Sequence, residues 1–139
     1  MTASNRILRA GDERLIVTPK TLIVDDEPDL LETCARLLQQ AGHTCLTAHT
    51  GREAVALIEA ERPNLVVTDF RLPTMDGLAV ARYARRASPP MPVIVITAYT
   101  TPHAKREAHQ AGATLFLPKP FSTAEFMDAV NRALATPLA

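Results

Sequence analysis

The chain has 139 residues, enough for one domain with a sizeable hydrophobic core and too few for two domains of ordinary size. Apolar residues make up 47% of the sequence and charged residues 22%, a composition that excludes a chain disordered along its whole length. Because 15 Lys and Arg residues balance 15 Asp and Glu residues, the sequence gives no sign of the basic surface that direct nucleic-acid binding requires.

The sequence also lacks membrane and secretion signals. No apolar run approaches the roughly 18 to 20 residues that cross a bilayer, and the first residues lack the apolar centre of a signal peptide. We therefore expect a cytoplasmic protein with no membrane partner. Cys34 and Cys45 lie in apolar segments, which predicts buried reduced thiols rather than a disulfide.

Residues 1–20 are mixed in polarity, so we predict a loosely ordered extension followed by one domain over 21–135 and a short tail, 136–139. The apolar run Leu15–Val17 within the extension is not assigned to a strand. In the rest of the chain, short apolar runs alternate with stretches of helical spacing. The predicted strands are Leu22–Val24, Cys45–Thr47, Leu65–Val67, Val93–Ile96 and Thr114–Leu117.

Local signals mark the predicted helices. The first begins at Pro28, which suits a first helical turn, and stops at Gly42. Its apolar stripe consists of Leu30, Cys34, Leu37, Leu38 and Ala41. Thr50 caps the second helix, with Glu53 in the capping-box position. The other helices are predicted at about Leu78–Ala87, at Pro102–Ala111 and after Ser122, where Glu125 completes a capping box and Phe126, Val130, Ala133 and Leu134 share a face.

Strict alternation of five strands and five helices predicts parallel strands joined by right-handed crossovers, with helices on both faces of the sheet. Runs almost without polar residues, such as Val93–Ile96, agree with strands buried on both faces. The predicted fold class is therefore α/β, a doubly wound five-stranded parallel sheet.

Polar side chains follow four of the predicted strands. Asp25 and Asp26 follow the first strand, Asp69 the third, Thr97 the fourth and Lys119 the fifth. A lone Asp after a strand is more often a turn or cap residue, and a lone Thr or Lys there even more often has no functional meaning. Because the carboxyl ends of parallel strands meet at one edge, where ligands bind, the five together indicate a functional site.

The residue types at this edge favour phosphoryl chemistry with a metal ion. Crowded carboxylates raise one another's pKa unless a cation neutralises them. Oxygen ligands without His or Cys favour a hard ion, and Mg²⁺ suits partial protein ligation better than Ca²⁺ does. With Lys119 and Thr97 donating to oxygens that gain charge, Asp69 is predicted to be a nucleophile that forms an acyl phosphate.

Four stretches carry these residues: LIVDDEPDLL, VVTDFRLPTMDGL, VIVITAY and LFLPKPF. In their order and spacing they resemble the receiver domains of two-component response regulators, over about Thr21–Leu134. The resemblance implies a flavodoxin-like fold with strand order 2-1-3-4-5. It also implies a phosphoprotein of phosphorelay signal transduction, not an enzyme with a separate turnover substrate.

The resemblance assigns the metal and acceptor chemistry to particular residues. It implies that Asp69 is the phosphoacceptor, which takes a phosphoryl group from a phosphohistidine on a sensor histidine kinase or a phosphotransfer protein. Asp26, Asp69 and the backbone carbonyl of Arg71 are expected to bind Mg²⁺ directly. Asp25 is expected to act mainly through a bound water.

Three other roles follow from the resemblance. Thr97 and Lys119 match the hydroxyl and the ammonium that contact the phosphoryl group. The peptide bond between Lys119 and Pro120 is expected to be cis. Gly77 matches the tight turn beyond the acceptor loop.

The sequence departs from many receivers at a few positions. Phe116 stands where a tyrosine is common, so the predicted switch formed by Thr97 and Phe116 lacks a phenolic hydroxyl. Arg71 and Tyr99 occupy positions that tune the lifetime of the phosphoryl group in this family. Our hypothesis is that both side chains limit the approach of water to phosphorus and give a long-lived phosphoryl state.

Other functions remain as alternatives. A degenerate receiver acting as a constitutive binding module is one, although the presence of all five site residues argues against it. A phosphatase with an aspartate nucleophile needs an acid two residues later, where this chain has Arg71. Because only Ala135–Ala139 follow the last helix, we expect either a stand-alone module or an excised receiver of a longer transcriptional regulator. The downstream partner and a phosphorylation-dependent homodimer stay open.

Two further groups of residues are set aside. The histidines His43, His49, His103 and His109 lack the spacing of zinc ligands. Arg82, Arg85 and Arg86 are interpreted as a solvated face of the third helix rather than a nucleic-acid site.

Overall fold

The computed structural model describes residues 6–8, 15–73 and 75–135. Its main sheet has five parallel strands in the order β4-β3-β5-β6-β7. These strands are β3 (Lys20–Val24), β4 (Thr44–Ala48), β5 (Leu65–Asp69), β6 (Val93–Thr97) and β7 (Leu115–Pro118). Numbered along the domain, this is the order 2-1-3-4-5, so the predicted flavodoxin-like topology is confirmed.

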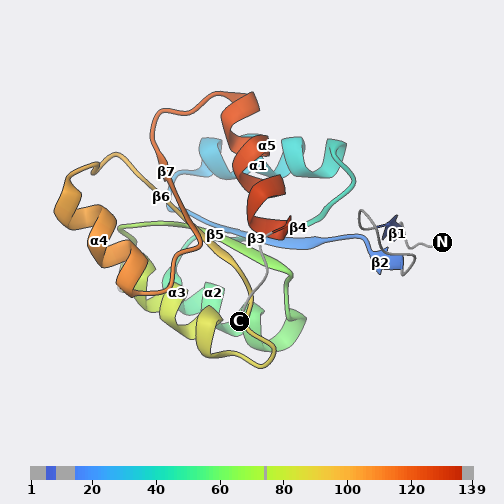
Figure 1. The fold of residues 1–139 in the computed structure, drawn as a ribbon, viewed down its shortest axis with the longest axis horizontal. Coiled ribbons are helices and arrows are strands. Elements are labelled where there is room, and N and C mark those ends of the chain that lie inside the picture. The colour runs from blue at the N-terminus through green and yellow to red at the C-terminus, as the bar shows by residue number, and fades with distance from the viewer. Residues whose placement is uncertain (1–5, 9–14, 74, 136–139) are drawn as a thin grey trace.

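Helices cover both faces of the sheet. They are α1 (Pro28–Gln40), α2 (Gly51–Glu61), α3 (Gly77–Arg86), α4 (Pro102–Gln110) and α5 (Thr123–Ala135). Helices α1 and α5 pack on one face, and α2, α3 and α4 pack on the other (Figure 1). The central strands are buried on both faces, which is why Val93–Thr97 contains no exposed residue.

The N-terminal region contains a pairing that the sequence did not predict. Leu15–Val17 forms strand β2 and pairs antiparallel with β1 (Arg6–Leu8), with Ile7 opposite Ile16. Strands of three residues are too short to show a periodic pattern, which explains why the sequence left this segment unassigned. Residues 1–5 and 9–14 of the predicted extension lie outside the described residues, as does the predicted tail, whereas Lys20 already belongs to β3.

The predicted helix ends agree with the observed caps. The N–H of Glu53 donates to Thr50 Oγ1 at 3.1 Å, while the Glu53 carboxylate accepts from His49 N rather than from Thr50 N. At α5 both capping-box bonds form between Ser122 and Glu125, at 2.8 and 3.0 Å. Helix α3 begins one residue earlier than predicted because Asp76 caps it by accepting from the N–H of Leu78.

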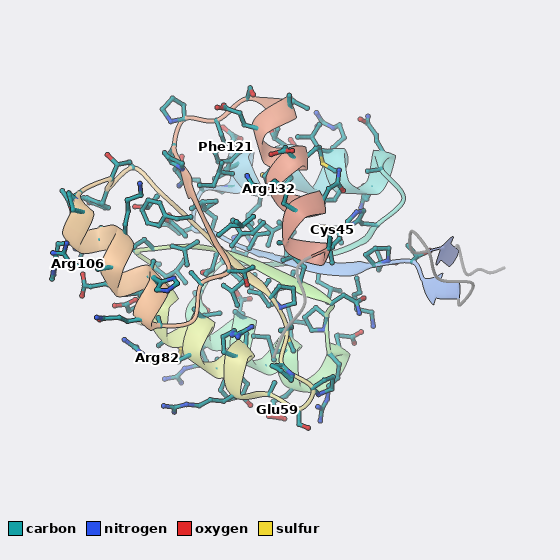
Figure 2. All side chains as sticks on the ribbon, viewed as in Figure 1. Cys45, Glu59, Arg82, Arg106, Phe121 and Arg132 are labelled. Atoms are coloured by element: carbon teal, nitrogen blue, oxygen red, sulfur yellow. The ribbon has the colours of Figure 1, made fainter. Side chains whose placement is uncertain are left out.

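Two predicted surfaces differ in detail from the structure. Helix α1 buries Leu31, Cys34 and Leu38, whereas Ala41, predicted in the stripe, is exposed at the C-cap. Arg82 and Arg106 point outward from α3 and α4 (Figure 2), but Arg85 is half-buried because helical spacing turns it toward the α4–β7 turn. The arginines of α3 are therefore only partly a solvated face.

Both cysteines are free, as predicted; Cys34 is buried, whereas Cys45, predicted to be buried, is only half-buried. Burial, assisted by the nearby charge of Asp25, raises the pKa of the Cys34 thiol to about 12. Burial likewise raises the pKa of Cys45 to about 11. Since the thiolate is the reactive form, we expect the native protein to resist Ellman's reagent at neutral pH. The urea-unfolded protein should react at both thiols, and a native protein that reacts as fast as free cysteine would contradict this prediction.

Candidate functional site

The pairing register of the sheet brings the predicted site residues to one edge. Val24 of β3 lies opposite Thr68 of β5, so Asp25 follows β3 at the level of Asp69. Thr97 ends β6, and its partner on β7 is Pro118, which directly precedes Lys119. The structure therefore places Asp25, Asp26, Asp69, Thr97 and Lys119 at the carboxyl edge of the sheet.

Lys119 is the centre of the ionic contacts at this edge. Its Nζ lies 3.1 Å from Asp25 Oδ2, 3.2 Å from Asp69 Oδ2 and 3.2 Å from Glu27 Oε1. The Lys119–Pro120 peptide bond is cis, as the resemblance implied. The sequence analysis did not identify Glu27 as a member of this cluster. The available signal was a third consecutive acidic residue directly after a strand.

Burial differs among the carboxylates. Asp25 is fully buried, Asp69 is half-buried and Asp26 is exposed. Burial raises the pKa of the Asp25 carboxyl above its ordinary value, although hydrogen bonds from the Glu27 N–H and from Lys119 oppose part of that effect. Burial alone would lower the pKa of Lys119, but its bond to Asp25 and the charges of Asp69 and Asp25 outweigh it and raise that pKa. Lys119 therefore stays charged at neutral pH.

The three aspartates form a set of oxygen ligands suited to a hard cation. One carboxylate oxygen from each of Asp25, Asp26 and Asp69 lies within 4.8 Å of the others. Among the residues that the structure describes, no other group of three His, Cys, Asp or Glu side chains comes as close. One ammonium cannot neutralise three aspartates and Glu27, so the site has an excess of negative charge. A divalent ion with oxygen preference fits this donor set, and Mg²⁺ is such an ion.

The Thr97 hydroxyl is buried and bonded within its own loop. The backbone N–H of Tyr99 donates to Thr97 Oγ1 at 2.8 Å. The N–H of Lys119 donates to the Thr97 carbonyl oxygen at 2.8 Å, which ties the ends of β6 and β7 together. Thr97 thus connects the strand that carries it to both Lys119 and the loop after β6.

A guanidinium and two aromatic rings connect the loops that follow β5 and β6. The Arg71 guanidinium carbon lies 5.0 Å from the centre of the Tyr99 ring and 5.7 Å from that of Phe70. Such cation–π contacts connect the loop after β5 with the loop after β6. Tyr99 is 53% exposed and is the one large hydrophobic residue so exposed among the described side chains. The two positions assigned to lifetime tuning are therefore in contact with each other.

Gly77 is required by a close approach of two backbones. Its N–H donates to the Phe70 carbonyl oxygen at 3.1 Å. A Cβ at this position would lie 1.7 Å from the carbonyl oxygen of Asp69. Residue 77 must therefore lack a side chain if α3 is to start against the acceptor strand.

Phe116 lies on β7, away from the acidic cluster. Its side chain is half-buried and packs against the core formed with α2, α3 and α4. Lys105 Nζ of α4 lies 6.0 Å from the centre of the ring. Phe116, predicted to form a switch with Thr97, therefore links β7 to α4.

Comparison with known protein families identifies the family of this chain. The family model described as the response regulator receiver domain matches residues 21–131. The chain belongs to this family. The described part of this receiver domain contains no helix long and apolar enough to cross a membrane.

Two other proteins are similar in sequence to this receiver domain. The receiver domain is 37% identical over 113 residues to the DNA-binding transcriptional regulator NtrC of Salmonella typhimurium, covering 81% of this chain and 24% of NtrC. It is 37% identical over 108 residues to the response regulator MprA of Mycolicibacterium vanbaalenii, covering 78% of this chain and 47% of MprA. The chain thus spans less than half the length of either relative.

Solved structures share the fold. The chemotaxis protein CheY4 of Vibrio cholerae superposes with a TM-score of 0.79 at 31% identity, covering 84% of this chain and 98% of CheY4. A CheY-like receiver domain protein from Methanospirillum hungatei superposes with a TM-score of 0.80 at 29% identity, covering 84% of this chain and 94% of that protein.

Proposed function

We propose that this receiver domain accepts a phosphoryl group on Asp69 from a phosphohistidine of a sensor histidine kinase or phosphotransfer protein. The supporting observation is the position of the Asp69 carboxylate, 3.2 Å from Lys119 Nζ and within 4.8 Å of oxygens from Asp25 and Asp26. Mg²⁺ would be held by Asp26, Asp69 and the backbone carbonyl of Arg71, with Asp25 acting through water.

The proposed transfer is an in-line displacement at phosphorus. An Asp69 oxygen attacks phosphorus while the P–N bond to the histidine breaks. The imidazole leaves with the electron pair of that bond and takes up a proton from solvent, and Asp69 becomes an acyl phosphate. Lys119 donates to the phosphoryl oxygens, and Thr97 donates once its hydroxyl leaves its present position. Bound Mg²⁺ would neutralise part of the negative charge that the carboxylates and the phosphoryl group share.

Phosphorylation would act as a signal rather than as a step in turnover. Movement of Thr97 would shift the loop after β6 and change the packing of Phe116 against α4, which alters the surface offered to a partner. The reader of that surface is a downstream protein, an output domain or a second copy of the domain in a phosphorylation-dependent homodimer. We place these events in the cytoplasm.

Acetyl phosphate provides a direct test, because it needs no cognate kinase. The domain is incubated with acetyl phosphate and Mg²⁺, and its intact mass is measured. We expect one added phosphoryl group, lost when EDTA replaces Mg²⁺ and absent in Asp69→Asn. An equal adduct in Asp69→Asn would show that the wrong residue was assigned.

A constitutive binding module is the second candidate. It would be favoured if the wild-type domain, folded by circular dichroism, gained no phosphoryl group under these conditions. Because NtrC is named as a DNA-binding transcriptional regulator, a transcriptional output joined to this receiver is a further proposal about the whole protein. Direct nucleic-acid binding by the receiver itself is not proposed.

The contact of Arg71 with Tyr99 supports a slow loss of the phosphoryl group. The backbone N–H of Arg71 donates to Asp69 Oδ1 at 3.4 Å, and the Arg71 side chain contacts the Tyr99 ring. We propose that the two side chains limit the approach of water to phosphorus. We expect Arg71→Ala combined with Tyr99→Ala to accelerate phosphate loss several-fold, measured by intact mass after removal of acetyl phosphate. Arg106→Ala, an exposed arginine on α4, should leave the rate unchanged. Unaltered kinetics in the double variant would refute the hypothesis.

A further inference from the structure

All three N–H donors of the Lys119 ammonium have an acceptor in this structure. An ammonium has three donors and no more. Here they meet Asp25 Oδ2 at 3.1 Å, Asp69 Oδ2 at 3.2 Å and Glu27 Oε1 at 3.2 Å. A phosphoryl oxygen that bonds to Lys119 must therefore replace one of these carboxylates.

The three carboxylates differ in how easily they can release Lys119. The Asp25 side chain is 0% exposed, so losing its cation would leave a buried charge unpaired. Asp69, whose side chain is 13% exposed, carries the phosphoryl group in the proposed function and remains next to Lys119. The Glu27 side chain is 64% exposed and regains water when it leaves. Glu27 is therefore the carboxylate that can be displaced at the least cost.

The backbone around Glu27 directs its side chain to Lys119. Glu27 occupies the N-cap position of α1, yet its side chain makes no cap hydrogen bond. Its N–H donates to Asp25 Oδ1 at 2.9 Å, which fixes the turn between β3 and α1. The carboxylate thus reaches across to Lys119, 92 residues away in sequence, instead of bonding to its own helix.

We propose that Glu27 is a positioning residue that occupies one donor of Lys119 in the unphosphorylated domain and gives up that donor to a phosphoryl oxygen. This role rests on the proposed function of Asp69. Its consequence is that Glu27 opposes phosphorylation: it must be displaced, and its charge repels an anionic phosphodonor. Removing the contact should increase both the rate of phosphorylation and the affinity for a phosphoryl analogue.

Three matched variants separate the effect of the Glu27–Lys119 contact from the effect of negative charge near the site. Glu27→Gln removes the charge at nearly constant shape. Glu27→Asp keeps the charge but is one methylene shorter, and an aspartate at an N-cap bonds to its own helix. Asp29→Asn removes an exposed charge two residues away in the first turn of α1 and serves as the control.

The phosphorylation rate is measured with acetyl phosphate and Mg²⁺ by intact mass, and beryllofluoride affinity by ¹⁹F NMR, at physiological ionic strength. We expect Glu27→Gln and Glu27→Asp each to increase both quantities about two- to fivefold, the range set by an exposed ion pair. Asp29→Asn should change them by less than about 1.5-fold because salt screens it. Thermal unfolding of each variant is recorded, since a merely structural role would shift the melting temperature without raising beryllofluoride affinity.

Other outcomes overturn the role of Glu27. If Glu27→Asp behaves like wild type while Glu27→Gln and Asp29→Asn accelerate equally, the effect is charge alone. If both Glu27 variants match wild type, or phosphorylate more slowly, Glu27 does not compete for Lys119. A wild-type domain without any adduct at Asp69 overturns the proposed function instead, so the two failures are distinguishable.

Discussion

Replacing Gly77 by alanine is expected to lower the free energy of unfolding by about 3 kcal/mol and to abolish phosphorylation of Asp69. The new Cβ would lie 1.7 Å from the Asp69 carbonyl oxygen and 2.9 Å from its carbonyl carbon. Both are backbone atoms of β5, so neither can rotate away as a side chain would. Relief requires that α3 move away from the acceptor strand, which displaces the loop carrying Arg71.

Urea unfolding and acetyl phosphate labelling of Gly77→Ala test this expectation together. Gly42→Ala is the matched control. Gly42 has a φ of +93°, and a Cβ there would meet nothing within 4 Å. That variant should lose only about 1 kcal/mol through backbone strain and should label normally. Stability and labelling of Gly77→Ala equal to wild type would contradict the close approach of the two backbones.

The parts of the fold that follow from local sequence were predictable. Val93–Ile96 could be assigned because a strand covered on both faces has no polar side chain. Thr50 and Ser122 could be assigned because an N-cap bonds within one helical turn. The strand order needed the family resemblance, since alternation predicts parallel strands but not their sequence in the sheet.

Features that depend on tertiary contacts were not predictable in the same way. Because α1 contains leucines at consecutive positions, the sequence alone does not show which side of the helix faces the sheet. Ala41 was therefore predicted in the apolar stripe and Leu31 was not, whereas packing against the sheet buries Leu31. The pairing of Leu15–Val17 with β1 likewise is a tertiary contact, because its partner strand lies in a stretch of mixed polarity with no strand pattern of its own.

In the candidate site, too, some features could be predicted from the sequence and others depend on tertiary contacts. That Asp25, Asp69, Thr97 and Lys119 would meet follows from the geometry of any parallel sheet. Which oxygen each side chain bonds does not follow from it. Glu27 reaches Lys119 across the site, and Tyr99 contacts Arg71 between two loops. A third consecutive acidic residue after β3 draws attention to Glu27 but does not identify Lys119 as its partner.

Replacing Lys119 by methionine is expected to lower the free energy of unfolding by about 3 kcal/mol near pH 7.5, measured by urea unfolding with EDTA present. The Asp25 side chain is 0% exposed and bonds to Lys119 Nζ at 3.1 Å. Methionine fills much of the space of lysine, so the main loss is the cation. Arg106→Met is the control, because Arg106 is exposed on α4 and should change stability by less than about 0.5 kcal/mol.

The loss in Lys119→Met should shrink as the solution becomes acidic. Burial raises the pKa of the Asp25 carboxyl above 3.8 in the native state, and removing Lys119 raises it further. At pH values between the unfolded-state and native-state pKa of Asp25, the native state binds a proton more tightly than the unfolded state does. Lowering the pH in this range therefore stabilises the variant. Lys119 has a native pKa above its ordinary 10.5, so it remains charged in wild type over this range and contributes no slope. The difference in free energy of unfolding between variant and wild type should therefore shrink as the pH is lowered from 7.5. A difference that stays constant or widens in acid would show that Asp25 does not depend on Lys119.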